Sequence, residues 1–284
     1  MKKVLVTGGN GQLGLCIKSL ENDLGNGNHF IYLTSEEMDV TSAESIDAAI
    51  TSFDPSYIVN CAAYTAVDKA ESDKEAAYLV NATGSELLAK ACKSNNIVLI
   101  HISTDFVFGD TRPLPLTEDM ETAPTGVYGA SKLAGEKLIT ENMSNYFIIR
   151  TSWLYSEFQN NFLKTMLRLG KERDELSVVY DQAGTPTYAV DLAGFIHHII
   201  NTNSDKFGLY HYSNEGVTSW YDFAFEIFKL SGIKIDLKPI TSDKFPTPAK
   251  RPNYSVMAKD KVKDNFNVTV KHWTTSVADC LTKI

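Results

Sequence analysis

Short apolar runs alternate with longer amphipathic stretches over the first 150 residues. The apolar runs have the length of strands and occupy residues 4–6, 30–33, 57–60, 97–102 and 147–149. The amphipathic stretches predict helices over residues 12–24, 42–53, 74–94 and 128–142. Strands that are buried on both faces read as continuous apolar runs, which is typical of a parallel sheet covered by helices. The pattern therefore predicts an α/β fold with a Rossmann-type doubly wound parallel sheet.

The pattern becomes less regular after residue 150. Helices are expected at residues 161–171, 191–200 and 220–230. A strand at residues 176–180 is expected to continue the sheet. Four of the nine prolines lie between residues 238 and 252, where we expect no regular structure because proline removes a backbone donor. We expect residues 1–150 to form the core, with its sheet continued by parts of residues 151–215, and residues 151–284 to form mainly a smaller C-terminal lobe.

Composition and charge narrow the class of partner. A net charge of −8 and a pI near 5.3 argue against nucleic acid as the main partner. The apolar runs are far shorter than the roughly 20 residues of a membrane span, and the chain passes from Met1 into a strand without a signal-peptide pattern. We therefore expect a cytoplasmic protein that binds a small molecule and has neither a nucleic-acid nor a membrane partner. Four widely separated cysteines without metal-ligand spacing are expected to be reduced and packed: Cys16, Cys61, Cys92 and Cys280.

A glycine pattern, Gly8-x-x-Gly11-x-x-Gly14, lies between the first predicted strand and the first predicted helix. Gly8 permits a tight turn, Gly11 lets a pyrophosphate approach the backbone, and Gly14 lets the helix pack closely on the strand. The free N–H groups at the start of the helix can then bind phosphates. The spacing differs from that of the commonest dehydrogenases, but its strand–turn–helix context predicts a dinucleotide site.

The end of the second strand bears on the choice between NAD and NADP. An acidic residue there would bind the adenosine 2′-hydroxyl and a basic one the 2′-phosphate, whereas this strand ends in Leu33-Thr34-Ser35. Small hydroxyl residues leave room for the phosphate, which favours NADPH with NADH tolerated. Asp39 and Val40 are candidate adenine contacts, and Asp39 could equally cap the following helix.

Small and polar residues follow the third and fourth strands, at the sheet edge where doubly wound folds bind ligands. Ala62 and Ala63 would let a planar cofactor lie against the backbone, or could simply pack beneath the next helix. After the fourth strand, a hydroxyl could polarise a substrate carbonyl by hydrogen bonding. Thr104 is the first candidate and Ser103 the second, although Ser103-Thr104-Asp105 could also form a turn or a cap.

Tyr128 and Lys132 carry the most informative chemical signal. They lie four residues apart on a predicted helix, so their side chains share one face within roughly 6 Å. A neighbouring ammonium stabilises a phenolate, so the pKa of Tyr128 is expected to fall from its usual value of about 10. Such a phenol can pass a proton to or from a carbonyl oxygen. Following a dinucleotide motif, this pair predicts a carbonyl reductase.

The glycine pattern, the Thr104 region and Tyr128-x-x-x-Lys132, in this order, resemble the extended short-chain dehydrogenase/reductase family. Within that family the chain resembles the dTDP-4-dehydrorhamnose reductases over nearly its whole length. The other matching segments are residues 60–68, 103–108 and 150–155, Asp181-Gln182-x-Gly184-x-Pro186-Thr187 and Arg251-Pro252. The resemblance implies an NAD(P)-binding core, a substrate-binding lobe and the NAD(P)H-dependent reduction of the C4 ketone of dTDP-4-dehydro-β-L-rhamnose.

The resemblance also implies roles for individual residues. Tyr128 would donate a proton to the C4 oxygen, Lys132 would lower the pKa of Tyr128 and hold the nicotinamide ribose, and Thr104 would hydrogen-bond the C4 carbonyl. The other residues that would contact the substrate are Asp105, Trp153 and Arg251. The other residues that would line the cofactor are Gly8, Gly11, Gln12, Leu13, Gly14, Asp39, Val40, Ala62, Ala63, Tyr64, Thr65, Ile102 and Ser103. The alternatives are a core aromatic for Trp153 and a solvated loop charge for Arg251.

Three positions depart from the family pattern. In some members a magnesium ion bridges a dimer through carboxylates, whereas Leu15 and Val190 stand at those positions here. We therefore expect no metal site, and a monomer or a weak homodimer. Phe106 stands where tyrosine is frequent, which removes a polar contact with the sugar.

Two other functions are compatible with the same motifs. One is a reductase or epimerase of another nucleotide sugar. The other is a non-catalytic NADP-binding regulatory subunit that resembles the β subunit of methionine adenosyltransferase. The complete set of Thr104, Tyr128 and Lys132 argues against a non-catalytic role.

Overall fold

The centre of the molecule is a six-stranded parallel sheet with the strand order β10-β5-β4-β3-β1-β2. The computed structural model describes residues 1–109 and 113–284. The strands are β1 (Lys3–Thr7), β2 (His29–Leu33), β3 (Tyr57–Asn60), β4 (Val98–Thr104), β5 (Tyr146–Thr151) and β10 (Gly208–His211). All five strands predicted in the first 150 residues belong to this sheet, which confirms the doubly wound α/β fold.

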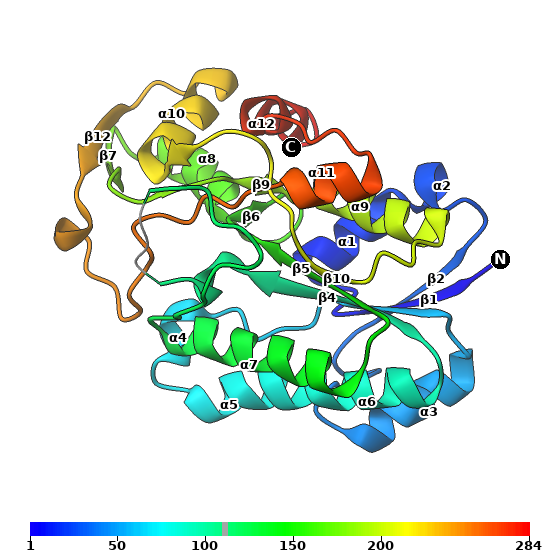
Figure 1. The fold of residues 1–284 in the computed structure, drawn as a ribbon. Helices are drawn as coiled ribbons and strands as arrows, with labels where there is room; N and C mark the ends of the chain where they lie inside the picture. Colours follow the sequence, from blue (N-terminus) through cyan, green and yellow to red (C-terminus); the bar gives the residue numbers. More distant parts are fainter. Residues whose placement is uncertain (110–112) are drawn as a thin grey trace.

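Helices cover both faces of the sheet (Figure 1). One face carries α3 (Ala43–Phe53), α6 (Gly84–Ser94) and α7 (Val127–Asn142), and the other carries α1 (Gln12–Ser19), α9 (Ala189–Thr202) and α11 (Asp260–Phe266). A separate core fills each interface. Ile46, Leu88 and Ile139 are buried in the first, and Ile17 and Ile196 in the second. Burial on both faces explains why the strands read as continuous apolar runs.

Two of the predicted helices are interrupted. The helix expected at residues 12–24 forms α1 and the short α2 (Glu21–Leu24). The helix expected at residues 74–94 consists of α5 (Lys74–Tyr78), a π-helical turn at Leu79–Thr83, and α6. The π-helical turn places the Asn81 amide against Tyr64, which follows β3. Asn81 Oδ1 accepts from the Tyr64 N–H at 2.9 Å, and Asn81 Nδ2 donates to Ser131 Oγ on α7 at 3.0 Å. A π-helical turn often marks a functional site, and here it fixes the segment that follows β3.

The strand predicted at residues 176–180 exists, but it does not continue the central sheet. It forms β7 (Glu175–Val179), which pairs in parallel with β12 (Asp236–Ile240) in a separate two-stranded sheet, and β10 takes the sixth place in the central sheet. Burial alternates along β7, as in a strand with one solvated face, whereas the central strands are buried on both faces. The expectation of no regular structure between residues 238 and 252 is also wrong. Strand β12 includes Pro239, which is tolerated because a two-stranded sheet leaves each strand with a free edge.

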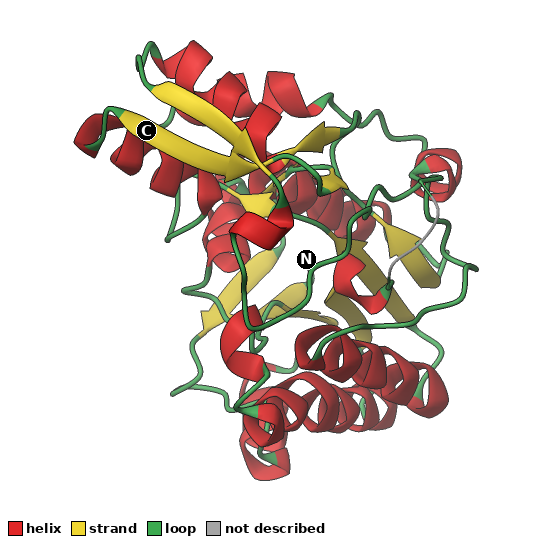
Figure 2. Ribbon diagram, turned by 90° about the vertical axis from the view of Figure 1, so that its left-hand side faces the viewer, coloured by secondary structure: helices red, strands yellow, loops and turns green. Residues whose placement is uncertain are grey.

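The remaining elements form a smaller group beyond the carboxyl ends of the central strands. They are β6 (Leu154–Tyr155), α8 (Phe162–Glu172), β8 (Ala183–Gly184), β9 (Thr187–Tyr188), β11 (Thr218–Ser219), α10 (Trp220–Ser231) and α12 (Trp273–Leu281). A third core, which includes Tyr155, Leu163 and Phe223, holds these elements together. Figures 1 and 2 show the β7–β12 pair set apart from the central sheet, beside these helices.

Two further expectations concern the whole chain. The four cysteines are free thiols, and three of them are buried. In the described ranges, no helix is both long and apolar enough to cross a membrane.

Candidate active site

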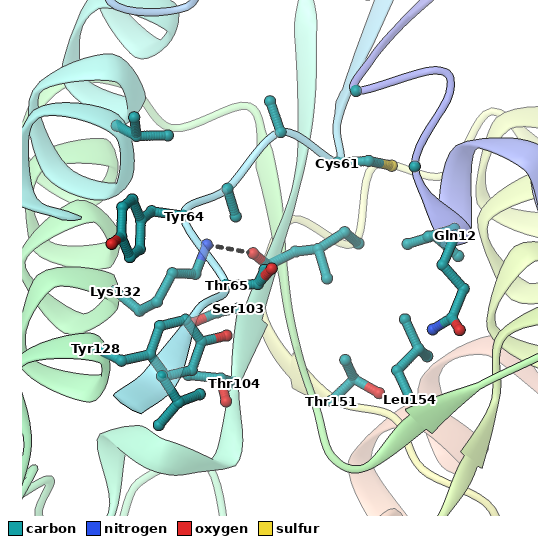
Figure 3. A pocket seen from close by; sticks show the side chains of 18 of the residues that line it. Gln12, Cys61, Tyr64, Thr65, Ser103, Thr104, Tyr128, Lys132, Thr151 and Leu154 are labelled. Atoms are coloured by element: carbon teal, nitrogen blue, oxygen red, sulfur yellow. Dashed lines mark hydrogen bonds between the residues drawn. The ribbon is translucent and has the colours of Figure 1, made fainter. Parts of the chain in front are cut away.

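A cavity of about 980 Å³ opens at the carboxyl edge of the central sheet. Its walls come from the glycine turn after β1, the segments that follow β3 and β4, helix α7, and the residues after β5 (Figure 3). The strand order reverses between β1 and β3, so the loops that follow these two strands lead to helices on opposite faces and leave a crevice. The fold itself therefore places the cavity.

Most of the residues predicted for the site line this cavity. They are Gly8, Gly11, Gln12, Leu13, Asp39, Val40, Ala62, Ala63, Tyr64, Thr65, Ile102, Ser103, Thr104, Asp105, Tyr128, Lys132 and Trp153. Gly14 and Arg251 lie outside the lining. Among residues 1–109 and 113–284, no group of three or more His, Cys, Asp or Glu side chains is placed to hold a metal ion.

The glycine turn has the geometry that a dinucleotide phosphate needs. Gly8 has φ +62°, and a Cβ there would lie 3.0 Å from the Ala62 N. A Cβ on Gly14 would lie 2.7 Å from the Gly8 carbonyl oxygen, so Gly14 serves the close packing of α1 on the turn. Helix α1 begins after Gly11 without a side-chain cap, which leaves its first N–H groups free for an anion. The turn therefore fits a pyrophosphate.

The residues after β2 shape another part of the lining. Asp39 Oδ1 accepts hydrogen bonds from the Thr41 N–H at 2.8 Å and from Thr41 Oγ1 at 2.7 Å. The N-cap of α3 is Ser42, whose hydroxyl accepts from the Ser45 N–H. The alternative that Asp39 caps this helix is therefore wrong: its carboxylate closes a tight turn on the cavity wall. Ser35 also lines the cavity.

Thr104 and Tyr128 meet where β4 ends against α7. The Thr104 hydroxyl caps a short 3-10 turn by accepting from the Phe106 N–H at 3.2 Å, and it donates to Asp105 Oδ1 at 3.1 Å. The cap and the catalytic interpretations of Thr104 are thus compatible. A Cβ on Gly129 would lie only 2.1 Å from the Phe106 carbonyl oxygen, so glycine beside Tyr128 lets the helix approach the strand end.

Lys132 is almost completely buried beneath the cavity and faces β4. Its Nζ donates to the Ile102 carbonyl oxygen at 2.6 Å (Figure 3). The same Nζ lies 3.1 Å from His101 Nε2. Burial lowers the pKa of Lys132 to about 8, opposed by the charge of Glu136 and by Cys61.

The pKa of Tyr128 does not fall as the sequence predicts. Burial raises it to about 12, with the hydrogen bond from Thr104 opposing the rise and the charge of Asp105 adding to it. The reason is geometric, because the amino group of Lys132 is bonded to β4 and does not contact the phenol.

Asp105 is a buried carboxyl in the cavity wall. Burial raises its pKa to about 6, although hydrogen bonds with Ser255 and Thr104 act in the opposite direction. Among the described residues, Asp105 Oδ2 and Thr151 Oγ1 are buried without a hydrogen-bond partner, and both residues line the cavity. Buried polar atoms without a partner are costly, so these two are candidates for contacts with a bound molecule.

Of the aromatic wall of the cavity, the sequence predicted Trp153 but not Trp220 or Phe162. Trp153 stacks on Trp220 with ring centroids 3.6 Å apart, and Phe162 packs against Trp220 at 4.7 Å. Trp153 has φ +47°, an unfavourable conformation for a bulky residue, and a Cβ on Gly184 would come within 2.6 Å of its ring. Trp220 and Phe162 belong to helices of the lobe and lie in no motif, so only the tertiary fold reveals them. Trp153 therefore lines the cavity and also packs against the lobe core.

Arg251 lies beside the cavity in an ion pair. Its Nη2 is 2.9 Å from Asp68 Oδ2, and Asp68 Oδ1 also accepts from the Ala249 N–H at 3.2 Å. The pair joins the proline-rich segment 245–252 to α4 (Val67–Ala70), which follows the cofactor-side residues after β3. Arg251 is therefore not simply a solvated loop charge.

Comparison with known proteins identifies the family. The family described as the RmlD substrate binding domain matches residues 1–284. The dTDP-4-dehydrorhamnose reductase of Escherichia coli strain K12 is 41% identical over 99% of this chain and 97% of its own length. The crystal structure of a dTDP-4-dehydrorhamnose reductase from Clostridium acetobutylicum superposes with a TM-score of 0.95 at 40% identity, covering 99% of each chain. The Bacillus anthracis structure, in complex with NADP, gives 0.94 at 39% identity and covers 100% of this chain and 99% of its own. The chain therefore belongs to the RmlD substrate binding domain family.

Proposed function

We propose that the protein is an NADPH-dependent reductase that converts dTDP-4-dehydro-β-L-rhamnose to dTDP-β-L-rhamnose, the last step of dTDP-L-rhamnose biosynthesis. The observation that carries the proposal is the convergence of Thr104, Tyr128 and Lys132 with the glycine turn in one cavity. Relatives named dTDP-4-dehydrorhamnose reductase, similar over the full length of the chain, support this choice of substrate.

The first part of the site would hold the cofactor. The glycine turn and the start of α1 would bind the pyrophosphate, Asp39 and Val40 would contact the adenine, and Lys132 would bind the nicotinamide ribose. When bound, the reduced nicotinamide supplies the hydride. NADPH is favoured because β2 runs out into Leu33-Thr34-Ser35, with Ser35 on the cavity wall, and because the Bacillus anthracis relative holds NADP; NADH would be tolerated.

The chain's own contribution to the reaction is polarisation and proton transfer. Thr104 would donate a hydrogen bond to the C4 carbonyl oxygen and so favour hydride attack at C4. Tyr128 would then give its phenolic proton to the same oxygen. A pKa near 12 keeps this phenol protonated at neutral pH, which is the form that a proton donor needs.

The lobe would bind the rest of the substrate. Asp105 Oδ2, which lacks a partner among the described residues, would accept from a sugar hydroxyl, and Trp153 would form an apolar wall that Trp220 supports. Arg251 would bind the substrate diphosphate only by exchanging its ion pair with Asp68. On this proposal, residues 151–284 form mainly the substrate-binding lobe, and residues 1–150 the NAD(P)-binding core.

The test is NADPH oxidation at 340 nm, with the substrate generated in situ by the upstream dehydratase and epimerase. We expect turnover that disappears when the epimerase is omitted and reappears when it is restored. Turnover that persists without the epimerase would indicate a different 4-keto sugar as the substrate. Binding of NADPH without any turnover would contradict the reductase assignment.

A further inference from the structure

His101 is a buried titratable residue on β4 to which the proposed reaction gives no role. Its Nε2 lies 3.1 Å from Lys132 Nζ, and its Nδ1 lies 3.0 Å from Asn60 Nδ2 on β3. Asn60 Oδ1 in turn accepts from Thr7 Oγ1 on β1 at 2.7 Å. All four side chains are nearly inaccessible to solvent. A buried hydrogen-bonded chain therefore runs from the lysine of the site across three neighbouring strands.

The ring of His101 must be neutral. Burial, and then the charge of Lys132, hold the pKa of His101 well below its usual value of 6.5. A neutral imidazole carries one proton, so one ring nitrogen donates and the other accepts. The two neighbours of the ring therefore cannot both donate to it.

Two arrangements give each nitrogen of the ring a hydrogen-bond partner of the right kind. If Lys132 is a neutral amine, it accepts from His101 Nε2–H, and Nδ1 accepts from Asn60 Nδ2. If Lys132 is an ammonium, it donates to His101 Nε2, and His101 Nδ1 carries the ring proton. The side-chain amide of Asn60 is then turned over, so that its oxygen accepts from Nδ1–H and its NH₂ group faces the Thr7 hydroxyl. Between the two, Lys132 loses one proton to solvent while the single proton of the ring changes nitrogen. In both, Lys132 still donates to the Ile102 carbonyl oxygen.

The other titratable groups near Lys132 do not provide this adaptability. The charge of Glu136, on the same helix, raises the pKa of Lys132. The Glu136 carboxylate is, however, hydrogen-bonded to Ser103 Oγ and to Arg150. Cys61 raises the pKa of Lys132, but among the described residues neither Cys61 nor Tyr128 forms a hydrogen bond with Lys132 Nζ. His101 is the titratable side chain within hydrogen-bond distance of Lys132 Nζ among the described residues.

We infer that His101 is a positioning residue of the reaction: with Asn60, it gives the amino group of Lys132 a hydrogen-bond partner in either charge state by moving its ring proton between Nδ1 and Nε2. The inference rests on the proposed role of Lys132 in the reductase. Because the burial that His101 shares with Lys132 brings the pKa of the lysine to about 8, both charge states are accessible near neutral pH.

The direct test is a ¹⁵N NMR titration of the six histidines between pH 6 and 10, with His101 assigned by loss of its signals in His101→Gln. We expect His101 to stay neutral while its proton moves from Nδ1 to Nε2 as Lys132 loses its charge, and to keep one tautomer in Lys132→Met. His197, a buried histidine whose Nε2 bonds the Ile17 carbonyl oxygen, is the internal control and should keep one tautomer. A fixed His101 tautomer in the wild type, or a change that persists in Lys132→Met, overturns the inference. The titration needs no turnover, so its failure is distinguishable from failure of the reductase proposal.

A kinetic test uses His101→Phe, with His197→Phe as the matched control. Without an acceptor, the ammonium of Lys132 is less stable, so the alkaline limb of kcat/KM for NADPH should move down by about one pH unit or more. His101→Gln, whose amide oxygen can accept from the ammonium, should shift the limb less. An alkaline limb that does not move in a folded His101→Phe protein contradicts the positioning role, and if that variant does not fold, the wild-type titration still decides.

Discussion

The two sides of the cavity are built in different ways. The cofactor side is built mainly from the glycine turn and the segments that follow β1, β2 and β3, in one stretch of the parallel sheet, with Lys132 added from α7. The substrate side combines Asp105 at the end of β4 with Trp153, Trp220 and Phe162 from separate segments of the lobe. Strand order places the first side, whereas side-chain packing within the lobe places the second. The cofactor side should therefore be sensitive to backbone changes, and the substrate side to changes in side-chain volume and charge.

Tyr128 lies where the two sides meet, and its substitution should have the largest effect. Tyr128→Phe removes the proton donor while keeping the ring that packs edge-on against Phe106, so kcat should fall by roughly 10²- to 10⁴-fold. The Kd for NADPH, measured by fluorescence titration, should change by less than about twofold. Tyr146→Phe, at the start of β5, is the matched control and should keep its kcat. Near-wild-type kcat in Tyr128→Phe would show that another group donates the proton.

Asp105 should make the substrate side sensitive to pH. Its pKa is near 6 in the folded protein against about 3.8 in the unfolded chain, so the folded state binds more protons between these values. The contribution of Asp105 to stability should therefore be greatest below about pH 4 and should fall by about 3 kcal/mol as the pH rises to about 6 and above. Asp105→Asn should remove this part of the pH dependence in urea unfolding measured from pH 4 to 7. A wild type and a variant with parallel pH profiles would contradict the assignment.

The glycine turn tests the cofactor side. Gly8→Ala forces a side chain into a left-handed backbone and against the Ala62 backbone, which should cost about 1–2 kcal/mol of stability and weaken NADPH binding roughly tenfold or more. Gly27→Ala is the matched control, because Gly27 has φ +73° with open space around it. It should lower Tm without changing the Kd for NADPH. Equal Kd values for NADPH in the two variants would show that the glycine turn does not bind the cofactor.

Trp220 tests the substrate side. Trp220→Leu removes the ring that stacks on Trp153, so KM for the nucleotide sugar should rise by up to about tenfold while the Kd for NADPH stays constant. Trp273→Phe, which alters the lobe core away from the cavity lining, controls for a general loosening of the lobe. If both variants raise KM equally, the stack has no specific role.

The ion pair between Arg251 and Asp68 should have the smallest effect. Both side chains are partly exposed, so a double-mutant cycle of Arg251→Ala and Asp68→Ala in urea unfolding should give a coupling of about 0.2–1 kcal/mol. A coupling of zero would mean that the pair does not hold the proline-rich segment to α4. A larger rise in substrate KM for Arg251→Ala than for Asp68→Ala would support the exchange of this pair for a diphosphate.

The sequence predicts the residues of the cofactor side better than those of the substrate side, because local patterns form the first and packing between distant segments forms the second. Gly8 and Gly14, the small residues after β3 and the helical pair Tyr128 and Lys132 are local patterns whose spacing determines their geometry. Trp220, in contrast, reaches the cavity only because α10 packs on α8 in the lobe core. Strand β7 was misplaced because a short apolar run does not show which sheet it joins.

The pKa of Tyr128 was predicted in the wrong direction because spacing places two side chains on one face but does not orient their ends. Lys132 turns its amino group to Ile102 and His101, and these contacts depend on the strand that packs beneath the helix. The same reasoning applies to Arg251, whose motif gave its identity but not its partner Asp68. Local patterns thus predicted which residues belong to the site, but not which groups their side chains contact.

The most direct test of the account is the fate of the transferred hydrogen. Reduction with NADPH that carries deuterium at both C4 positions of the nicotinamide, in the presence of the upstream dehydratase and epimerase, should place one deuterium at C4 of the sugar in dTDP-β-L-rhamnose, as seen by NMR of the product. A product without deuterium, or with deuterium at another carbon, would contradict the assignment of Thr104 and Tyr128 to the C4 carbonyl.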